Sequence, residues 1–478
     1  MNYKPTIGIE VHVELKTKDK VFSYALNNTT ALPNTLVNIV DLAYPGVLPQ
    51  VNKEVVLFAI KIANALHANI TREMLFDRKN YFYPDLPKGY QITQSKTPIG
   101  TAGFLNITSD KKVRIHELHI EEDTCKSLHT ETETLLNYNR AGVPLIEIVS
   151  EPDMNSKEEA MAYLEKLKEL LFYLGVSDCK MEEGSMRADV NVSVSKDATL
   201  GTRCEIKNIG SIKEVGQAID YEVKRQIELL ENGEKIEEET RKFDEKTATT
   251  VLMRKKEVGN DYRYFPEPDI PALVITDSLI SEALKDEVML PEERRAFYIQ
   301  KGILPINADK LINNKELSDY LNTFMEDDID FRIASNLLLG DIAAYLNKNL
   351  VSINDLKLTK EKMIELVKML SNKEISSKNV KDILTDILET DLSVKEILAK
   401  SGISMNNNVD ELVSIIKEVI ALNMESVKAY KSGKENAFKF LMGMCMKMTK
   451  GSFNPKLVSD TLKDYLDTKI SDWLFLET

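Results

Sequence analysis

Strict alternation between apolar and polar residues in several short segments constrains the fold of this chain more than any other feature. In residues 6–15 every second side chain is apolar, and the side chains between them are Gly8, Glu10, His12 and Glu14. Because successive side chains of a β-strand point to opposite faces, the segment predicts a strand with one buried and one polar face. Segments 185–194 and 203–207 repeat the pattern with these polar residues: Ser185, Arg187, Asp189, Asn191 and Ser193, then Arg203, Glu205 and Lys207. A sheet of such strands presents carboxylates, amides and cations on one face, which is typical of an active-site floor.

Two further segments place acidic residues where buried strands are expected. Residues 115–121 alternate so that two glutamates and a histidine share one face, and the apolar run 145–149 contains a glutamate. A carboxylate in an apolar strand is costly unless it is paired or binds a cation. Mainly oxygen ligands suit Mg²⁺ with bound phosphates better than zinc. We therefore predict a cation site with four ligands: Glu10, His12, Glu121 and Glu147.

The familiar nucleotide-binding motifs are absent from the sequence. It contains neither GxxxxGK[ST] nor GxGxxG after a strand, so any ATP would bind through the metal-bearing sheet face rather than a glycine loop. Residues 76–91 are dense in aromatic, basic and prolyl residues, and Arg78, Lys79 and Lys88 could neutralise phosphate oxygens. A rigid surface loop with aromatic packing explains the same composition equally well. In residues 261–269, two prolines stiffen a segment that could project Arg263 and Glu267.

The length and composition indicate two or three globular domains. Of 478 residues, 43% are hydrophobic and 29% charged, and no run of about 18 apolar residues occurs. Residues 1–290 mix strand patterns with two helices, one after Ser156 and one near residues 213–231, and predict an α+β catalytic domain. Residues 291–405 predict an all-helical domain and 406–478 a small helical tail, joined by the polar stretch 404–408.

Charge and cysteine usage narrow the class of protein further. A net charge of −14 argues against binding nucleic acid by bulk electrostatics alone, yet residues 428–456 carry seven lysines and one acid. A solvated lysine face and a nucleic-acid contact are equally good explanations of that patch. The four cysteines are scattered, which argues against disulfides or a thiolate zinc site. The N-terminus shows no targeting segment, so we expect a cytoplasmic protein.

Several of these segments together resemble a known family. They are IGIEVHVELKT, FDRKNYFYPDLPKGYQI, HIEED, NRAGVPLIEIVSEPD, MEEGSMRADVNVSV, GTRCEIKN, DYRYFPEPD and KMTKG, in this order along the chain. The chain is similar to the B subunits of the aspartyl/glutamyl-tRNA amidotransferases. The resemblance implies an antiparallel-sheet cradle of glutamine-synthetase-like topology followed by two helical domains. It also implies that glutamate or aspartate mischarged on tRNA is phosphorylated by ATP and then amidated by ammonia.

The resemblance also implies roles for individual residues. The Mg²⁺ ligands would be the four residues named above. Five residues would surround the nucleotide, the acyl phosphate or the ammonia entry: Lys79, Arg187, Asp189, Glu205 and Lys207. Further nucleotide contacts are predicted for four residues: Arg78, Lys88, Ser185 and Asn191. Residues 428–456 fall where the family's tail contacts tRNA, which favours nucleic-acid binding by those lysines.

Partners are implied because the chain lacks an amidase or glutaminase signature of its own. Ammonia would come from the family's glutaminase, its A subunit, with the small C subunit bound to both. Many relatives carry a cysteine set for zinc, but in this chain Phe22, Ser23 and Tyr24 stand in the first of its two regions and no cysteine stands in the second, so no zinc is expected. A non-catalytic tRNA-binding scaffold is the alternative, and it would have no need for carboxylates in apolar strands. A free-standing ligase resembling glutamine synthetase would explain the sheet but not the basic tail.

Overall fold

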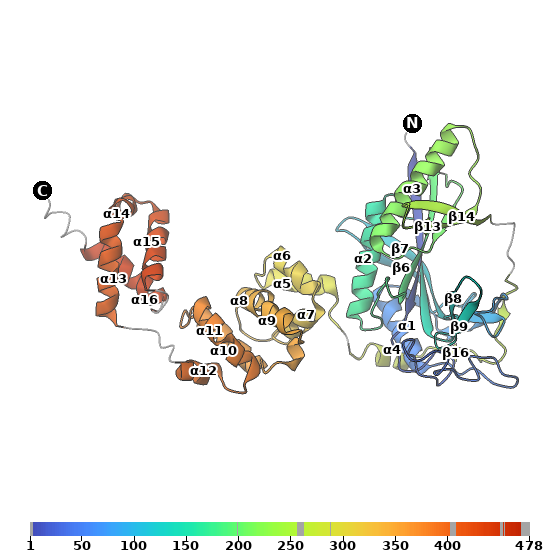
Figure 1. Cartoon of the computed structure of the whole chain (residues 1–478), viewed down its shortest axis with the longest axis horizontal. Helices are drawn as coiled ribbons and strands as arrows, with labels where there is room; N and C mark the ends of the chain where they lie inside the picture. Colours follow the sequence, from blue (N-terminus) through green and yellow to red (C-terminus); the bar gives the residue numbers. More distant parts are fainter. Residues whose placement is uncertain are drawn as a thin grey trace. The chain divides into compact units, whose positions relative to one another are not determined.

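The computed structural model describes residues 3–197, 199–255, 262–286, 288–401, 408–449, 453 and 455–469. The chain divides into two compact units, residues 1–290 and 291–478. The first unit combines a large sheet with helices, and the described part of the second is helical (Figure 1). The chain is therefore of mixed α/β class. The linker predicted at 404–408 lies outside the described residues except for Asn408, which caps the next helix.

Nine strands form the central sheet of the first unit in the order β14-β13-β12-β11-β1-β10-β7-β6-β2. The strands are β1 (Lys4–Glu14), β2 (Asn69–Ile70), β6 (Gly100–Asn106), β7 (Lys112–Glu122), β10 (Pro144–Ser150), β11 (Met186–Ser195), β12 (Cys204–Lys207), β13 (Glu239–Asp244) and β14 (Thr249–Lys255). All neighbouring pairs of this sheet are antiparallel except β12 and β13. These two are parallel because helix α3 connects them as a crossover.

Three smaller sheets complete the first unit. One has the order β15-β4-β5, one pairs β16 with β3, and one is the β8-β9 hairpin. Their strands are β3 (Glu73–Met74), β4 (Asp77–Asn80), β5 (Tyr90–Thr93), β8 (Lys126–His129), β9 (Thr134–Asn137), β15 (Phe265–Pro266) and β16 (Leu273–Val274). The β4-β5 pair brings part of the basic and aromatic segment 76–91 beside the large sheet, because β5 contacts β7.

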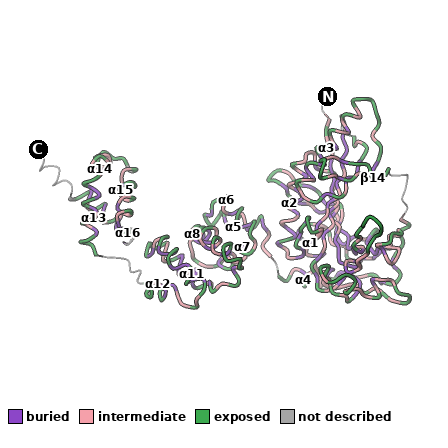
Figure 2. The backbone as a smooth tube through the Cα atoms, viewed as in Figure 1, coloured by how far each residue is buried: buried purple, intermediate pink, exposed green. Residues whose placement is uncertain are grey.

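One face of the large sheet is buried under helices. The helices of this unit are α1 (Lys53–Ala65), α2 (Lys157–Tyr173), α3 (Ile212–Glu231) and α4 (Asp277–Ala283). The apolar residues Ile7, Ile9, Val11 and Val13 of β1 share one core with α1, α2 and α3, and Figure 1 shows α2 and α3 along one side of the sheet. The two helices predicted from sequence are confirmed, and Ser156 caps α2 by accepting a hydrogen bond from a backbone N–H. Figure 2 shows the resulting buried layer, which leaves the opposite face for polar groups.

The described part of the second unit consists of short helices. They are α5 (Pro291–Gln300), α6 (Pro305–Ile312), α7 (Lys315–Asn322), α8 (Phe331–Leu337), α9 (Ala343–Asn349), α10 (Lys360–Ser371), α11 (Ser377–Glu389), α12 (Val394–Ser401), α13 (Val409–Leu422), α14 (Met424–Lys431), α15 (Glu435–Met448) and α16 (Pro455–Asp464). A π-helical turn, residues 338–342, joins α8 to α9, a 3₁₀ turn covers residues 353–355, and a second π-helical turn, residues 465–469, follows α16. None of the helices in the described residues is long and apolar enough to cross a membrane.

Helices α13 to α16 pack around a core of their own. Leu412, Ile416, Leu441 and Leu462 are fully buried in it. Phe453, from the lysine-rich segment 428–456, also belongs to this core. The described lysines of that segment are exposed: Lys428, Lys431, Lys434, Lys439, Lys447 and Lys456. The segment therefore presents its cations to the solvent and contributes part of its aromatic content to packing.

Candidate active site

Strand β1 lies at the centre of the polar face and fixes which side chains meet there. In the register, Glu10 stands opposite Asp189 of β11, and His12 stands opposite both Arg187 of β11 and Glu147 of β10. Directly opposite residues of an antiparallel pair project to the same face. The predicted polar residues of β1, β10 and β11 are thus gathered on one surface, which is the surface away from α2 and α3.

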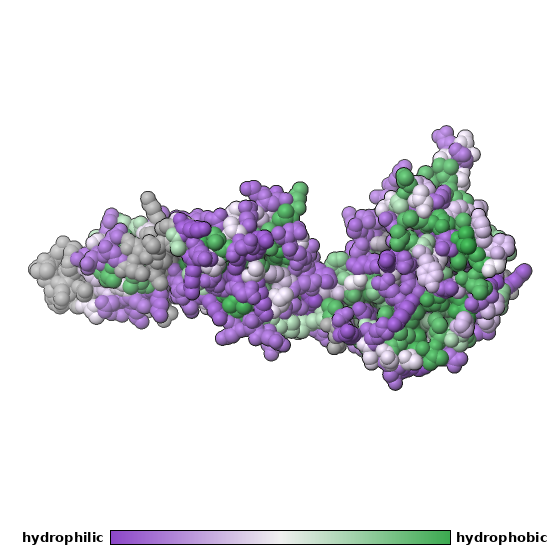
Figure 3. All heavy atoms as spheres, turned by 90° about the horizontal axis from the view of Figure 1, so that it is seen from below, coloured by the Kyte–Doolittle hydropathy of each residue, from purple (hydrophilic) through white to green (hydrophobic). Residues whose placement is uncertain are grey.

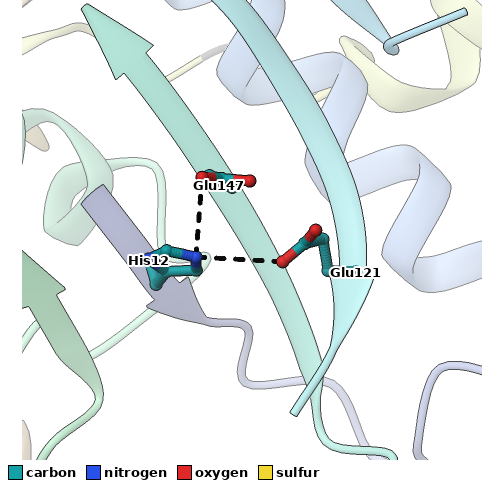
Figure 4. Close-up of side chains that lie close together, drawn as sticks. All are labelled: His12, Glu121 and Glu147. Atoms are coloured by element: carbon teal, nitrogen blue, oxygen red, sulfur yellow. Dashed lines mark ion pairs between the residues drawn. The ribbon is translucent and has the colours of Figure 1, made fainter. Parts of the chain in front are cut away.

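A first cluster joins His12, Glu121 and Glu147 from β1, β7 and β10 (Figure 4). The His12 Nε2 atom lies 3.8 Å from Oε2 of Glu121 and 3.6 Å from Oε1 of Glu147. One ligand atom from each of the three residues lies within 4.8 Å of the other two. The side chain of Glu121 is 3% exposed and that of Glu147 is 17% exposed. Three groups able to hold a metal ion therefore converge on one small, largely buried volume.

The electrostatics of this cluster are unfavourable for an additional negative charge. Burial raises the pKa of Glu147, and the neighbouring carboxylate of Glu121 raises it further, while His12 and His119 oppose the rise. The two histidines therefore do not fully offset the cost of a negative charge on Glu147. A divalent cation between these side chains would supply that compensation.

Surrounding residues fix the orientation of the cluster. Gln91 Nε2 donates a hydrogen bond of 3.2 Å to Glu121, and the Thr93 hydroxyl donates another to the same carboxylate. His119 stands opposite Glu147, and its Nε2 lies 3.0 Å from Glu117. Burial opposes charge on His119, but Glu117 and Glu147 raise its pKa more strongly. Partners of this kind hold metal ligands in place and tune their affinity.

A second cluster joins Glu10, Asp189 and Glu205 from β1, β11 and β12. Lys207 reaches across it, with Nζ 3.0 Å from Glu205 and in contact with Asp189. Asn191 donates a hydrogen bond of 3.0 Å to Glu10, and the Thr240 hydroxyl donates one of 2.9 Å to Glu205. Burial lowers the pKa of Lys207, but Asp189 and Glu205 raise it more. Glu10 therefore has a lysine-paired group beside it, and its charge also contributes to the raised pKa of Glu147. Its role as a fourth metal ligand stays a prediction.

Two predicted cations approach the first cluster from different elements. The Nζ atom of Lys79, on β4, lies 5.2 Å from the centroid of the Tyr262 ring. Burial lowers the pKa of Lys79, but Glu121, Tyr264 and Glu147 together raise it more. Arg187 of β11 donates a hydrogen bond of 2.8 Å from its terminal nitrogen to Asp123. Its Nε atom is buried and has no hydrogen-bond partner in the part of the chain that the structure describes.

A cavity of about 530 Å³ opens over these groups. Its charged or titratable lining includes His12, Lys79, Glu121, Arg187, Asp189 and Lys207. Tyr81, Asn208 and Gly210 contribute uncharged walls. The cavity is large enough for a small ligand, and its walls carry both carboxylates and cations. Such a lining suits a metal-bound, phosphate-bearing ligand.

Four predicted nucleotide contacts have other partners in the structure. Arg78 makes hydrogen bonds of 2.7 and 2.8 Å to the buried Glu267 and stacks on a tyrosine ring. Lys88 forms a buried ion pair with Glu122, and the Ser185 hydroxyl bonds to the backbone of Lys180. Asn191, the fourth, holds Glu10 as described above. Their contact with a nucleotide stays a prediction, and Glu267 does not project as the segment 261–269 suggested.

Sequence reasoning missed two acidic residues beside Arg187. Asp123 is 5% exposed and contacts both Arg187 and Arg140. Burial and the charge of Asp123 raise the pKa of Glu14 to about 7, although both arginines lower it. The alternation in β1 could have pointed to Glu14, since this residue lies on the polar face of the strand. Asp123 follows Glu121 by two residues, which is the spacing of one strand face.

The fold and the site define a mixed α/β protein whose large sheet carries a polar floor with two carboxylate clusters. A family model described as "GatB/GatE catalytic domain" matches residues 5–281, and one described as "GatB domain" matches residues 319–466. The chain belongs to this GatB/GatE family.

Curated relatives agree with this assignment over nearly the whole chain. Three of them carry the same name, which designates the B subunit of an aspartyl/glutamyl-tRNA(Asn/Gln) amidotransferase. The relative from Lysinibacillus sphaericus is 44% identical over 97% of this chain and 99% of its own length. The relative from Ligilactobacillus salivarius is 44% identical over 97% and 98%. The relative from Staphylococcus aureus strain JH9 is 45% identical over 98% and 100%.

Proposed function

We propose that this chain is the carboxylate-activating component of a tRNA-dependent amidotransferase. The side-chain carboxylate of glutamate or aspartate on tRNA attacks the γ-phosphorus of ATP, and ADP leaves. Ammonia then attacks the acyl carbon, phosphate leaves, and the nitrogen loses a proton to give Gln-tRNA(Gln) or Asn-tRNA(Asn). The names of the relatives, which specify tRNA(Asn/Gln) and amidotransferase, support the reaction class. A carboxylate is a poor acyl donor and must be activated, and phosphorylation by ATP would supply phosphate as the leaving group.

The single observation that carries the proposal is the cluster of His12, Glu121 and Glu147. Its atoms fit a divalent cation in number and spacing, and burial together with the neighbouring Glu121 raises the pKa of Glu147 against the effect of two histidines. Mainly oxygen ligands favour Mg²⁺ over zinc, and we propose no zinc. When bound, Mg²⁺ would offset negative charge on the phosphate oxygens.

The chain's own cations would position the reacting groups. Arg187 has a buried Nε atom without a hydrogen-bond partner among the described residues, and an anionic oxygen in the cavity would satisfy it. Lys79, which also lines the cavity, would contact phosphate or the acyl phosphate. Lys207 would fix the positions of Asp189 and Glu205 beside the nucleotide. These roles need no glycine-rich phosphate loop.

The rest of the chain would serve assembly and tRNA binding. We propose that residues 1–290 form a cradle of glutamine-synthetase-like topology, that 291–405 form a helical domain, and that 406–478 form a tail whose exposed lysines contact tRNA in the cytoplasm. A glutaminase (the A subunit) and the small C subunit would deliver ammonia. Large apolar side chains exposed on the first unit support a protein interface, among them Tyr24, Leu32, Tyr44, Leu48 and Phe82. Figure 3 shows hydrophobic areas on the surface of this unit.

An isotope experiment tests the chemistry directly. The complex with its partner subunits would receive Mg-ATP, ammonium chloride and Glu-tRNA labelled with ¹⁸O in the side-chain carboxylate. Activation by phosphorylation transfers one ¹⁸O atom to inorganic phosphate for each amide formed. Amidation with no label in phosphate would overturn the proposed step. Replacing ammonium by glutamine tests whether the partner supplies ammonia.

A further inference from the structure

A buried cluster of charged residues joins helix α3 to strands β13 and β14, which lie beside it (Figure 1). Its central member, Glu222 of α3, is fully buried. The carboxylate of Glu222 accepts hydrogen bonds of 2.6 and 3.0 Å from Arg225, and one of 3.0 Å from the hydroxyl of Thr250 on β14. Arg241 of β13 lies 3.6 Å from the same carboxylate and 2.9 Å from that of Glu239. Two carboxylates and two guanidinium groups thus balance one another at the edge of the large sheet.

This cluster is ionic although its position is buried. Burial raises the pKa of Glu222, but the hydrogen bonds from three neighbouring side chains lower it more. Removing such charges from water costs about as much free energy as their pairing returns, so stability alone does not explain the cluster. Gln226 adds to the cost, because its Oε1 atom is buried and has no hydrogen-bond partner among the described residues. Fixing one arrangement of neighbouring elements is a role that suits a network of this kind.

Strand β13 connects the cluster to the candidate active site. Glu239 and Arg241 project to the face of the cluster, and Thr240, which lies between them in sequence, projects to the other face. In the parallel β12-β13 pair Thr240 stands opposite Glu205, to which its hydroxyl donates the hydrogen bond of 2.9 Å. A slip of one residue would bring Glu239 or Arg241 opposite Glu205 instead. The cluster therefore holds the register in which Thr240 meets Glu205.

Helix α3 extends the same constraint to a wall of the cavity. Residues 208–210 line the cavity, and the chain continues from them into Ser211, the N-cap of α3. The backbone N–H of Gly210 donates a hydrogen bond of 2.9 Å to Glu214 in the first turn of the helix. Because Glu222 fixes α3 against β13 and β14, it also fixes the start of the helix and the segment that leads into it.

We propose that Glu222 is a positioning residue for the nucleotide-binding side of the candidate active site. It acts through Thr240 on Glu205, and Glu205 in turn lies 3.0 Å from the Nζ atom of Lys207, which lines the cavity. The inference rests on the proposed function, since it takes ATP as the ligand of that cavity. The cavity lining does not include Glu222 itself, so its loss would displace groups that contact the nucleotide without removing any of them.

Steady-state kinetics of the complex with its partner subunits test this role. Glu222→Gln removes the charge and keeps the size of the side chain. Loss of a residue that directly supports a ligand-binding group costs about 10- to 100-fold, and Glu222 stands one contact further away, so we expect the KM for Mg-ATP to rise roughly 5- to 10-fold. The KM for Glu-tRNA should change less than about twofold. A loss of folded protein would lower the rate but would not raise the KM for one substrate alone.

A double-mutant cycle tests the path from Glu222 to the cavity. Thr240→Val alone should raise the KM for Mg-ATP about threefold. The double variant should have the KM of Glu222→Gln within about twofold, because residues that act along one path do not have independent effects. Leu167→Ala is the control for destabilisation, since Leu167 is fully buried in the core of the same unit. It should lower the unfolding temperature and leave the KM for Mg-ATP unchanged.

The contrary outcomes are distinguishable. An unchanged KM for Mg-ATP in Glu222→Gln, an equal rise in both KM values, or the same rise in Leu167→Ala would overturn the positioning role. Effects of Glu222→Gln and Thr240→Val that multiply in the double variant would overturn the path through Thr240. If the wild-type complex showed no ATP-dependent amidation, the proposed function itself would fail. Should Glu222→Gln not fold, Thr250→Val, which removes one hydrogen bond to Glu222, must raise the KM for Mg-ATP and leave that for Glu-tRNA unchanged.

Discussion

The two carboxylate clusters of the sheet share strand β1 but differ in how their charge is balanced. Glu10, Asp189 and Glu205 surround the ammonium group of Lys207. His12, Glu121 and Glu147 have an imidazole at their centre, with Lys79 acting from a greater distance. Burial and Glu121 accordingly raise the pKa of Glu147. The cluster of Glu10, Asp189 and Glu205 already contains a cation, whereas the His12 cluster gains more from an added one.

Acidic residues on a sheet therefore do not by themselves identify a metal site. An internal lysine can satisfy buried carboxylates as a structural ion pair. The cluster that lacks one is the better candidate for Mg²⁺. The predictions below test whether charge balance really separates the two clusters.

The largest expected effect comes from Glu147→Gln. The change removes a proposed metal ligand but keeps its size, and loss of merely supporting residues at metal sites costs about 10- to 100-fold. We expect ATP-dependent amidation to fall by at least about 100-fold, while the variant still assembles with its partner subunits. Steady-state rates and size-exclusion chromatography measure these two properties.

Glu205→Gln is the matched variant in the other cluster. Lys207 retains Asp189 as a partner in this variant, so we expect a smaller loss of activity than for Glu147→Gln. Normal turnover of Glu147→Gln would remove the metal assignment. A larger loss from Glu205→Gln would reverse the comparison between the clusters.

Lys207→Met should affect stability more than any change to an exposed pair. Removal of the lysine leaves Asp189 and Glu205 facing Glu10 without compensation, which should destabilise the chain by about 1–3 kcal/mol. Added Mg²⁺ should recover part of the loss by taking the place of the ammonium group. Thermal unfolding with and without Mg²⁺ measures both effects.

Lys255→Met provides the control for a surface ion pair. Lys255 pairs with Glu237, and both side chains are more than half exposed. Such pairs contribute between 0 and about 1 kcal/mol. Equal effects of the two lysine substitutions would show that Lys207 does not compensate a buried cluster.

The polar face could be predicted from sequence because the period of two alone decides which residues of a strand share a face. The sequence could not predict which carboxylates lie close together, since this depends on strand order and register. Glu10 and His12 share a face of β1, but their partners come from opposite sides of the strand. Asp189 approaches from β11 and Glu147 from β10. Spacing along the chain therefore could not show that Glu10 has its nearest acidic neighbours on β11 and β12, and whether it shares one ion with His12, Glu121 and Glu147 stays a prediction.

The ion pairs of Arg78 and Lys88 also could not be predicted from the sequence. Both residues have the charge that phosphate needs, and their segment does lie beside the large sheet. Their carboxylate partners, Glu267 and Glu122, stand 189 and 34 positions away in sequence. Only the folded chain shows these ion pairs. By contrast, the helices at Ser156 and 213–231 follow from local capping and periodicity, and these predictions are confirmed.

Glu14 extends the comparison to the second carboxylate on β1. Its pKa is about 7 because burial and Asp123 outweigh the two nearby arginines. An acid with a raised pKa in the folded state favours folding in its protonated form, so its contribution is complete below pH 4.5 and is lost as the pH rises through 7. We expect wild type to lose about 1–3 kcal/mol relative to Glu14→Gln between about pH 4.5 and about pH 7.5.

Thermal unfolding at both pH values measures the effect at Glu14. Glu183→Gln is the control, because Glu183 is exposed and pairs with Lys180 at the surface. A difference between wild type and Glu14→Gln that does not change with pH would show that folding leaves the pKa of Glu14 unshifted. The polar environment around Arg187 would then resemble the lysine-compensated cluster.

The smallest expected effect comes from a pair of matched hydroxyl deletions, one in each cluster. Thr93 donates a hydrogen bond to Glu121, and Thr240 donates one to Glu205. Thr93→Val should lower Mg²⁺ affinity about tenfold, because Glu121 loses a group that fixes its orientation as a ligand. Thr240→Val should change the Mg²⁺ affinity by less than about twofold, since Lys207 still holds Glu205. Calorimetric titration with Mg²⁺ compares the variants, and equal losses would mean that both clusters bind the ion. A loss only for Thr240→Val would instead place Mg²⁺ at the cluster that contains the lysine, because the hydroxyl of Thr93 would then have no metal ligand to orient.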